Sequence, residues 1–133
     1  MLIIEESNEL LEEPRIGFVS VNSTKTIEVY VHPDDGGNIP HFHVRKYSAS
    51  GKGFEWETCV RFDKAEYFKH GKYTDELPNR KTAKELDKML RTKRSNDPRN
   101  RTYWEFAIDM WNENNSAADV DINAVQPDYS QLK

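Results

Sequence analysis

The chain has a single cysteine among its 133 residues, Cys59, so no disulfide can form within it. No apolar run approaches the ~20 residues that a helix needs to cross a bilayer. The opening "MLII" is followed at once by "EESNELLEE", which does not have the apolar core of a secretory signal. We therefore expect an intracellular, cytoplasmic protein that makes no contact with a membrane.

The motifs of several enzyme classes are also missing. The sequence contains no phosphate-binding loop, no dinucleotide-binding fingerprint and no nucleophile elbow. The residues around Cys59 are not those of a cysteine protease, so we interpret it as an unreactive thiol. On these grounds no cofactor is expected.

Hydrophobic residues make up only 36% of the chain, below the about 45–50% that is usual for globular proteins. The three Trp, six Tyr and six Phe nevertheless argue against a disordered protein. A chain of 133 residues is most simply one domain. The composition predicts a small core rich in aromatic rings beneath a surface in which 32% of all residues are charged.

The net charge of −4 argues against a general affinity for nucleic acid, which requires a basic surface. Residues 79–101 are an exception, with nine Lys or Arg against three Asp or Glu. One interpretation is a solvated helix face and loop. The other is a local patch that meets nucleic acid or an acidic protein.

The first half of the chain alternates with the period of two that is typical of strands. Turn residues separate the alternating segments, which predicts an antiparallel meander sheet of about four strands. The segments are 15–21, 26–32, 41–47 and 54–62. In the last of them Phe54, Trp56, Val60 and Phe62 are predicted to face the core. Replacing Trp56 by Ala should then cost about 3–5 kcal/mol.

Two helices are predicted in the second half, over 80–93 with Asn79 as N-cap and over 102–114. Strands followed by helices are the order of an α+β fold, with both helices packed on one face of the sheet. We place this single α+β domain at residues 1–114. The predicted apolar stripes are Ala83, Leu86, Met89 and Leu90 on the first helix, and Trp104, Ala107, Ile108 and Trp111 on the second.

Residues 115–133 form an acidic C-terminal tail. Within it Val120 and Ile122 alternate with Asp119 and Asp121. The alternation predicts that residues 119–125 pair with a sheet edge, either in this chain or in a partner.

Three of the four histidines lie in the stretch "VHPDDGGNIPHFHVRKY" at 31–47. Residues i and i+2 of a strand project from the same face about 6.6 Å apart. His41 and His43 are therefore expected side by side, with Arg45 next along. Phe42 and Val44 would point into the core.

This pattern leaves three alternatives open. The pair can chelate a metal if a carboxylate or a third histidine completes the set. It can instead act as general acid and base, with Arg45 stabilising a developing phosphate charge. The third alternative is a structural role in which the imidazoles bond to neighbouring strands and loops. Completing ligands would come from His32, Asp34, Asp35, Glu55 or Glu57, whereas His70, before Gly71, is expected at the surface.

If the protein is an enzyme, the predicted catalytic residues are His41, His43 and Arg45. If it acts by binding, residues of the loop before this strand and of the neighbouring strand are added to the set. The predicted binding set is His32, Asp34, Asp35, His41, His43 and Arg45.

The stretch "IPHFHVRKY" resembles the signature of an uncharacterised bacterial domain family, in which a Pro-His-Phe-His-Val strand precedes more strands, a Gly…Leu-Pro segment and a helix bearing a Trp. The resemblance runs over about residues 27–114. Members are often filed near toxin–antitoxin-like gene pairs, and "ETCVRFDKAEYFKHGKYTDELPNRK" is similar to a variant in small proteins of gut bacteria and their mobile elements. The matching residues here are Pro40, His41, Phe42, His43, Val44, Gly71, Leu77, Pro78 and either Trp104 or Trp111.

Two functions follow as hypotheses. The first is a small bacterial or phage protein that binds a macromolecular partner, most simply a protein, as a toxin–antitoxin-like or host-defence-related inhibitor or regulator. The alternative is a ribonuclease-like or metal-dependent hydrolase built on the His-x-His strand. Nothing in the pattern predicts an oligomeric state.

Overall fold

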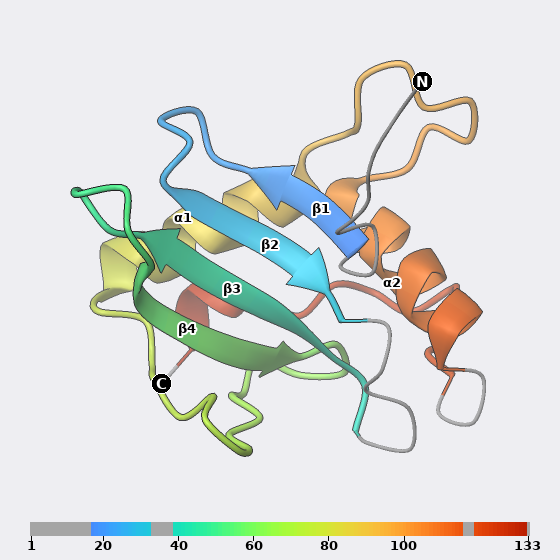
Figure 1. The fold of residues 1–133 in the computed structure, drawn as a ribbon. Helices are drawn as coiled ribbons and strands as arrows, with labels where there is room; N and C mark the ends of the chain where they lie inside the picture. The colour runs from blue at the N-terminus through green and yellow to red at the C-terminus, as the bar shows by residue number, and fades with distance from the viewer. Residues whose placement is uncertain (1–16, 33–38, 116–118, 133) are drawn as a thin grey trace, which may run out of the picture.

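The computed structural model describes residues 17–32, 39–115 and 119–132. Four antiparallel strands form one sheet in the order β1-β2-β3-β4, and the two helices cover one of its faces (Figure 1). The predicted α+β meander is therefore confirmed. The elements are β1 (Gly17–Val21), β2 (Ile27–Val31), β3 (His41–Tyr47), β4 (Phe54–Arg61), α1 (Arg80–Arg91), α2 (Tyr103–Asn114) and a short 3-10 helix, η2 (Tyr129–Gln131).

Strand β3 is buried on both faces over its first four residues, His41 to Val44. Phe42 and Val44 point into the core beneath the helices, as the alternation predicts. His41 and His43 point to the opposite face and are also fully buried. Side chains cover this part of the sheet, among them Tyr30 of β2 and Phe68 and Tyr73 from the segment after β4.

The first helix begins at its predicted cap, Asn79, and the second begins one residue later than predicted, with Thr102 as its N-cap. The side chain of Asn79 accepts a hydrogen bond from the backbone N–H of Thr82, and Thr102 forms a capping box with Glu105. In the described parts of the chain no helix is both long and apolar enough to cross a membrane.

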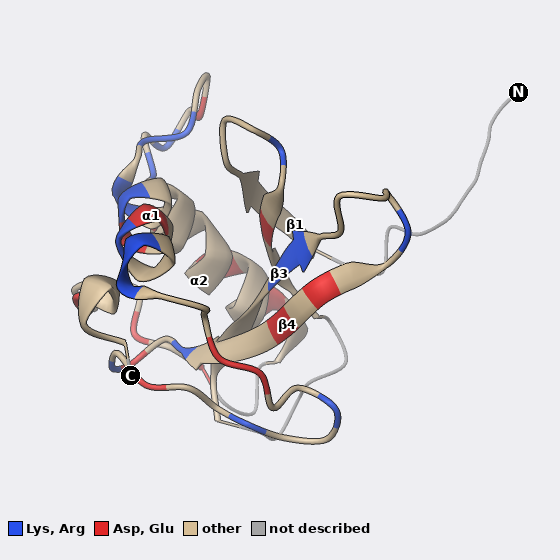
Figure 2. Ribbon diagram, turned by 90° about the vertical axis from the view of Figure 1, so that its left-hand side faces the viewer, with Lys and Arg blue, Asp and Glu red and all other residues tan. Residues whose placement is uncertain are grey.

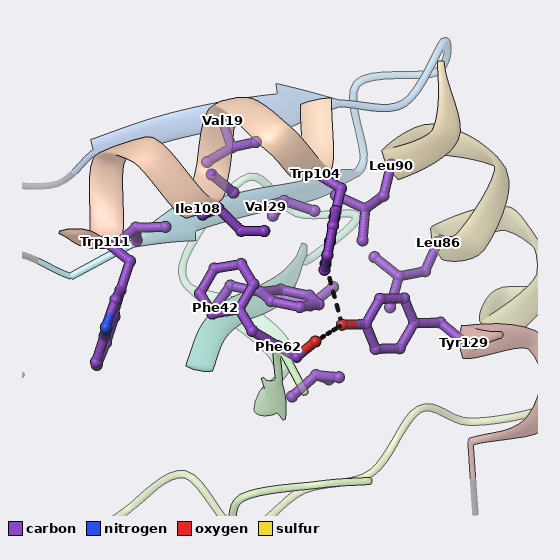
Figure 3. Close-up of a cluster of buried hydrophobic side chains, with 14 of the residues drawn as sticks. Val19, Val29, Phe42, Phe62, Leu86, Leu90, Trp104, Ile108, Trp111 and Tyr129 are labelled. Atoms are coloured by element: carbon purple, nitrogen blue, oxygen red, sulfur yellow. Dashed lines mark hydrogen bonds between the residues drawn. The ribbon is translucent and has the colours of Figure 1, made fainter. Parts of the chain in front are cut away.

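The predicted helix stripes form most of the core, together with the inward side chains of the sheet. Met89 is only partly buried, whereas the other stripe residues are buried. Figure 3 shows Trp104, Ile108 and Trp111 from α2 packed around Phe42 and Phe62. The aromatic core expected from the composition is thus present.

One end of β4 departs from the predicted alternation. The pairing of β3 with β4 is irregular between Lys46 and Tyr47, so Phe54 lies opposite Tyr47. This shift moves Phe54 to the face away from the helices, where it is 41% exposed and stacks on Tyr47 and Arg45. Trp56 is only half-buried. The prediction that both residues lie in the core is wrong for Phe54 and only partly right for Trp56.

The difference in burial can be measured at the two ends of the predicted segment 54–62. Phe62→Ala removes a ring that is 1% exposed and should cost about 3–5 kcal/mol of unfolding free energy. Phe54→Ala should cost less than about 1 kcal/mol, since exposed sites tolerate substitution. Denaturant unfolding of both variants checks the assignment, and equal costs would contradict the shifted register.

The C-terminal tail packs against the helices rather than adding a strand. The backbone of Val120 exchanges two hydrogen bonds with the side chain of Asn112 on α2. Further along, Gln126 and the backbone N–H of Tyr129 bond to Asp87 on α1. No described residue of 119–132 belongs to a strand, so the predicted pairing with this chain's own sheet edge is wrong. Pairing with a partner's sheet stays a prediction.

Candidate metal centre

Four side chains with metal-binding atoms meet on the sheet face opposite the helices. They are His41, His43, Cys59 and His70, called here the His–Cys cluster. One ligand atom from each side chain lies within 4.8 Å of the ligand atoms of the other three. Three segments of the chain contribute: β3, β4 and the segment that follows β4.

Strand pairing brings the first three residues together. His41 and His43 lie two residues apart on β3 and so share a face. Cys59 on β4 is the direct ladder partner of His43, and partners in a ladder project from the same side of the sheet. The sheet alone therefore fixes two imidazoles and one thiol next to one another.

His70 reaches the cluster because the chain turns back along β4. Tyr67 forms a β-bridge with Val60, and the backbone N–H of Phe68 donates to the carbonyl of Cys59 at 2.9 Å. A tight turn then pairs His70 with Tyr73, and Gly71 takes a positive φ of 55° within it. Residues 66–68 thus run beside β4 at the edge of the sheet, and the turn that follows places His70 beside Cys59 and Tyr73 against His43.

The distances suit tetrahedral coordination. Cys59 Sγ lies 3.4 Å from Nδ1 and 3.7 Å from Nε2 of His43, and 3.4 Å from Nε2 of His70. A tetrahedral zinc ion with Zn–N bonds of about 2.0–2.1 Å and a Zn–S bond of about 2.3 Å separates sulfur from nitrogen by about 3.5 Å. The cluster therefore needs only small shifts to enclose such an ion.

Acceptor groups lie beside two of the imidazoles. His41 Nδ1 lies 2.7 Å from the backbone carbonyl of Ile39, and a carbonyl can only accept, so Nδ1 carries the proton. The lone pair of His41 is then on Nε2. Glu57 Oε2 lies 3.8 Å from Nδ1 of His43, so its negative charge is next to that ring, and Nδ1 is also the His43 nitrogen nearer to Cys59 Sγ. Metal-binding histidines usually give their second N–H to a carbonyl or a carboxylate, as His41 does.

Glu57 is held in its charged form. Burial alone would raise the pKa of its carboxyl, but hydrogen bonds from His43 and Tyr30 and the charge of Arg45 outweigh burial and lower it. Tyr30 donates its hydroxyl to Glu57, and burial raises the pKa of this phenol far above its ordinary value. Glu57 is therefore an anion beside His43 at neutral pH.

Aromatic rings enclose the His–Cys cluster. Tyr30 stacks on His43 with ring centroids 4.7 Å apart, and Tyr73 meets the same imidazole edge-on. Phe68 and Trp111 pack against His41 at 4.9 and 5.2 Å. His41, His43 and Cys59 are each 0% exposed, and only His70 is half-buried. The shell makes the interior of the cluster a dry site.

The other predicted site residues lie either outside the His–Cys cluster or outside the described part of the chain. The ring of His32 lies 5.9 Å from that of His43, but His32 is not one of the four clustered donors. Arg45 is ion-paired with Glu28 at 2.7 Å, and its guanidinium lies over Tyr30. Glu55 pairs with Lys46, and Asp34 and Asp35 lie outside the described residues.

Two residues of the His–Cys cluster escaped the sequence analysis. Cys59 was interpreted as unreactive and His70 as a surface residue. A signal for Cys59 was present, because the predicted antiparallel pairing of 41–47 with 54–62 permits a register that sets it opposite His43. His70 carried no such signal, since its position depends on the backbone pairing of an irregular segment.

Comparisons of the chain with protein-family models, with curated proteins and with solved structures gave no significant match. The candidate centre therefore stands on its own geometry.

Proposed function

We propose that this protein binds one transition-metal ion, zinc first of all, through the His–Cys cluster. The observation that carries the proposal is the convergence of four donor atoms from three chain segments within 4.8 Å. The hydrogen bond from His41 Nδ1 to the carbonyl of Ile39 supports it, because it leaves the lone pair of that imidazole on Nε2, where it can bind a metal ion.

The donor types select the metal. Three imidazoles and one thiolate suit zinc, which favours nitrogen and sulfur ligands in a tetrahedron. Magnesium and calcium prefer oxygen donors, and none of the four ligand side chains supplies one. Copper and cobalt remain competitors for such a site, so the selection in a cell also depends on the supply of metal.

The role of the ion is structural. Four protein ligands fill a tetrahedron, whereas catalytic zinc sites keep one position for water or substrate. The ion would fasten the segment 62–73 to β3 and β4. A filled, dry site does not favour the hydrolase hypothesis. The function we propose for the domain is binding to a macromolecular partner, with zinc stabilising the fold.

Metal analysis of the purified protein tests the proposal. The chain prepared without chelators should contain about one zinc per molecule, and Cys59→Ser should lose most of it because a hydroxyl is a poor ligand for zinc. His32→Gln is the matched control, since His32 lies nearby but outside the cluster. A metal-free protein that also fails to take up added zinc would contradict the proposal.

A further inference from the structure

A groove lies between α1 and the end of the β1–β2 hairpin, away from the His–Cys cluster. It encloses about 650 Å³. Lys81, Lys84 and Lys88 line it on the helix side. Ser23 lies on the hairpin side, and Tyr103 at the start of α2 also lines it. We call it the α1 groove.

The three lysines share one face of α1, because residues three and four apart are neighbours on a helix. All three are exposed. In the described residues none of them lies within ion-pair distance of a carboxylate. Figure 2 shows the resulting concentration of basic residues on α1.

The rest of the basic segment behaves differently. Every arginine between residues 91 and 101 lies in an ion pair, although three aspartates serve the four arginines, and Lys93 donates to the backbone carbonyl of Asn100. The pairs are Arg91 with Asp87, Arg94 with Asp97, Arg99 with Asp109, and Arg101 with both Asp97 and Asp109. Within residues 79–101, Lys81, Lys84 and Lys88 therefore differ from these arginines, because they line the α1 groove with no paired carboxylate among the described residues.

One carboxylate, Glu85, also lines the groove. It accepts a hydrogen bond of 2.9 Å from the side chain of Asn22, which ties it to the hairpin wall. Three lysines against one glutamate leave a local charge of +2. The groove therefore attracts anions although the whole chain is acidic.

We propose that the α1 groove binds single-stranded nucleic acid. The lysines would contact successive phosphates as point charges, and the exposed hydroxyl of Ser23 would donate to phosphate or sugar oxygens. Tyr103, which packs partly against the core, also lines the groove and would stack a base on the part of its ring that stays exposed, the second feature of grooves that bind single strands. This ring favours a nucleic acid over an acidic peptide, which would use the lysines alone.

Fluorescence anisotropy with a labelled single-stranded RNA of mixed sequence tests the proposal at low and at higher salt. The triple change Lys81→Gln, Lys84→Gln, Lys88→Gln should weaken binding at least about 10-fold. It should also make the slope of log affinity against log salt concentration less steep by about 2, since each lost contact to a single strand removes about 0.7 from that slope. Tyr103→Leu should weaken binding with little change in that slope.

The matched control is Lys52→Gln, Lys64→Gln, Lys69→Gln, which removes the same charge from exposed lysines elsewhere. Its RNA affinity should stay within about 2-fold of the parent. Equal losses in the two triple variants, or no RNA binding at low salt, would overturn the proposal. A third contradicting result would combine two observations: polyglutamate competes with the labelled RNA as well as unlabelled RNA does, and Tyr103→Leu has the RNA affinity of the parent. The groove variants should keep their zinc, so this result is separable from that of the metal proposal.

Discussion

Removal of the bound metal should lower the melting temperature by on the order of 10–20 °C. An ion that binds only the folded state at about 1,000 times its dissociation constant stabilises that state by about 4 kcal/mol. For a domain of this size each 1 kcal/mol corresponds to several degrees, about 3–5 °C. Without the ion, nothing positive holds together the lone pairs of the buried imidazoles of His41 and His43, the half-buried imidazole of His70 and the buried thiol of Cys59. Thermal melts with and without chelator, in reductant, measure the shift.

Removal of the metal should first destabilise one local segment of the structure. The segment 62–73 is attached to β4 by few backbone hydrogen bonds, and His70 is its only contribution to the cluster. Amide exchange should therefore accelerate there before it does in the helices. Cys59→Ser should melt low and show no further shift with chelator. An unchanged melting temperature after complete removal of the metal would contradict a structural role.

Tyr129→Ala should cost about 3–5 kcal/mol of unfolding free energy, as expected for a large ring deleted from a core. Tyr129 is 0% exposed although it lies near the end of a polar tail. Its ring meets Phe42 edge-on at 5.4 Å, and its hydroxyl donates to the carbonyl of Arg61 at 2.7 Å. The hydroxyl also accepts from the indole of Trp104 and lies 3.3 Å from the carbonyl oxygen of Phe62 (Figure 3). Denaturant unfolding monitored by circular dichroism gives the value.

Tyr129→Phe separates the hydroxyl from the ring. It keeps the packing but leaves the Trp104 N–H and the Arg61 carbonyl without this partner, which should cost about 1–3 kcal/mol. Burial of the phenol also raises its pKa, so the native hydroxyl stays protonated at neutral pH and can donate. Near-parent stability of Tyr129→Ala would mean that the tail is not part of the core.

The sheet and both helices were predictable because their hydrophobic periods are clear. Asn79 and Thr102 mark the helix starts through side-chain capping, which is a local effect. Phe54 was misplaced because the irregular pairing beside Lys46 depends on two strands at once. Tyr129 was missed as a core residue because its neighbours in sequence are polar, and its burial depends on contacts with distant segments.

The site was half predictable for the same reason. The spacing of His41 and His43 on one strand is a local property, so their shared face was expected. The partners depend on the register of β3 with β4 and on the return of the chain after β4. The completing ligands were expected from His32 or from the carboxylates of Asp34, Asp35, Glu55 and Glu57. Cys59 and His70 complete the candidate set instead, and Glu57 lies beside His43 outside it.

The measurement that tests the account most directly is the absorption spectrum of the cobalt-substituted protein. Co²⁺ replaces zinc in tetrahedral sites, and there it shows intense visible d–d bands and a near-ultraviolet charge-transfer band when a thiolate is bound. We expect both features to saturate at one cobalt per chain and to be displaced by zinc. Cys59→Ser should abolish the charge-transfer band, and His32→Gln should leave the spectrum unchanged. A weak octahedral spectrum, or one identical in the parent and in Cys59→Ser, would contradict coordination by the His–Cys cluster.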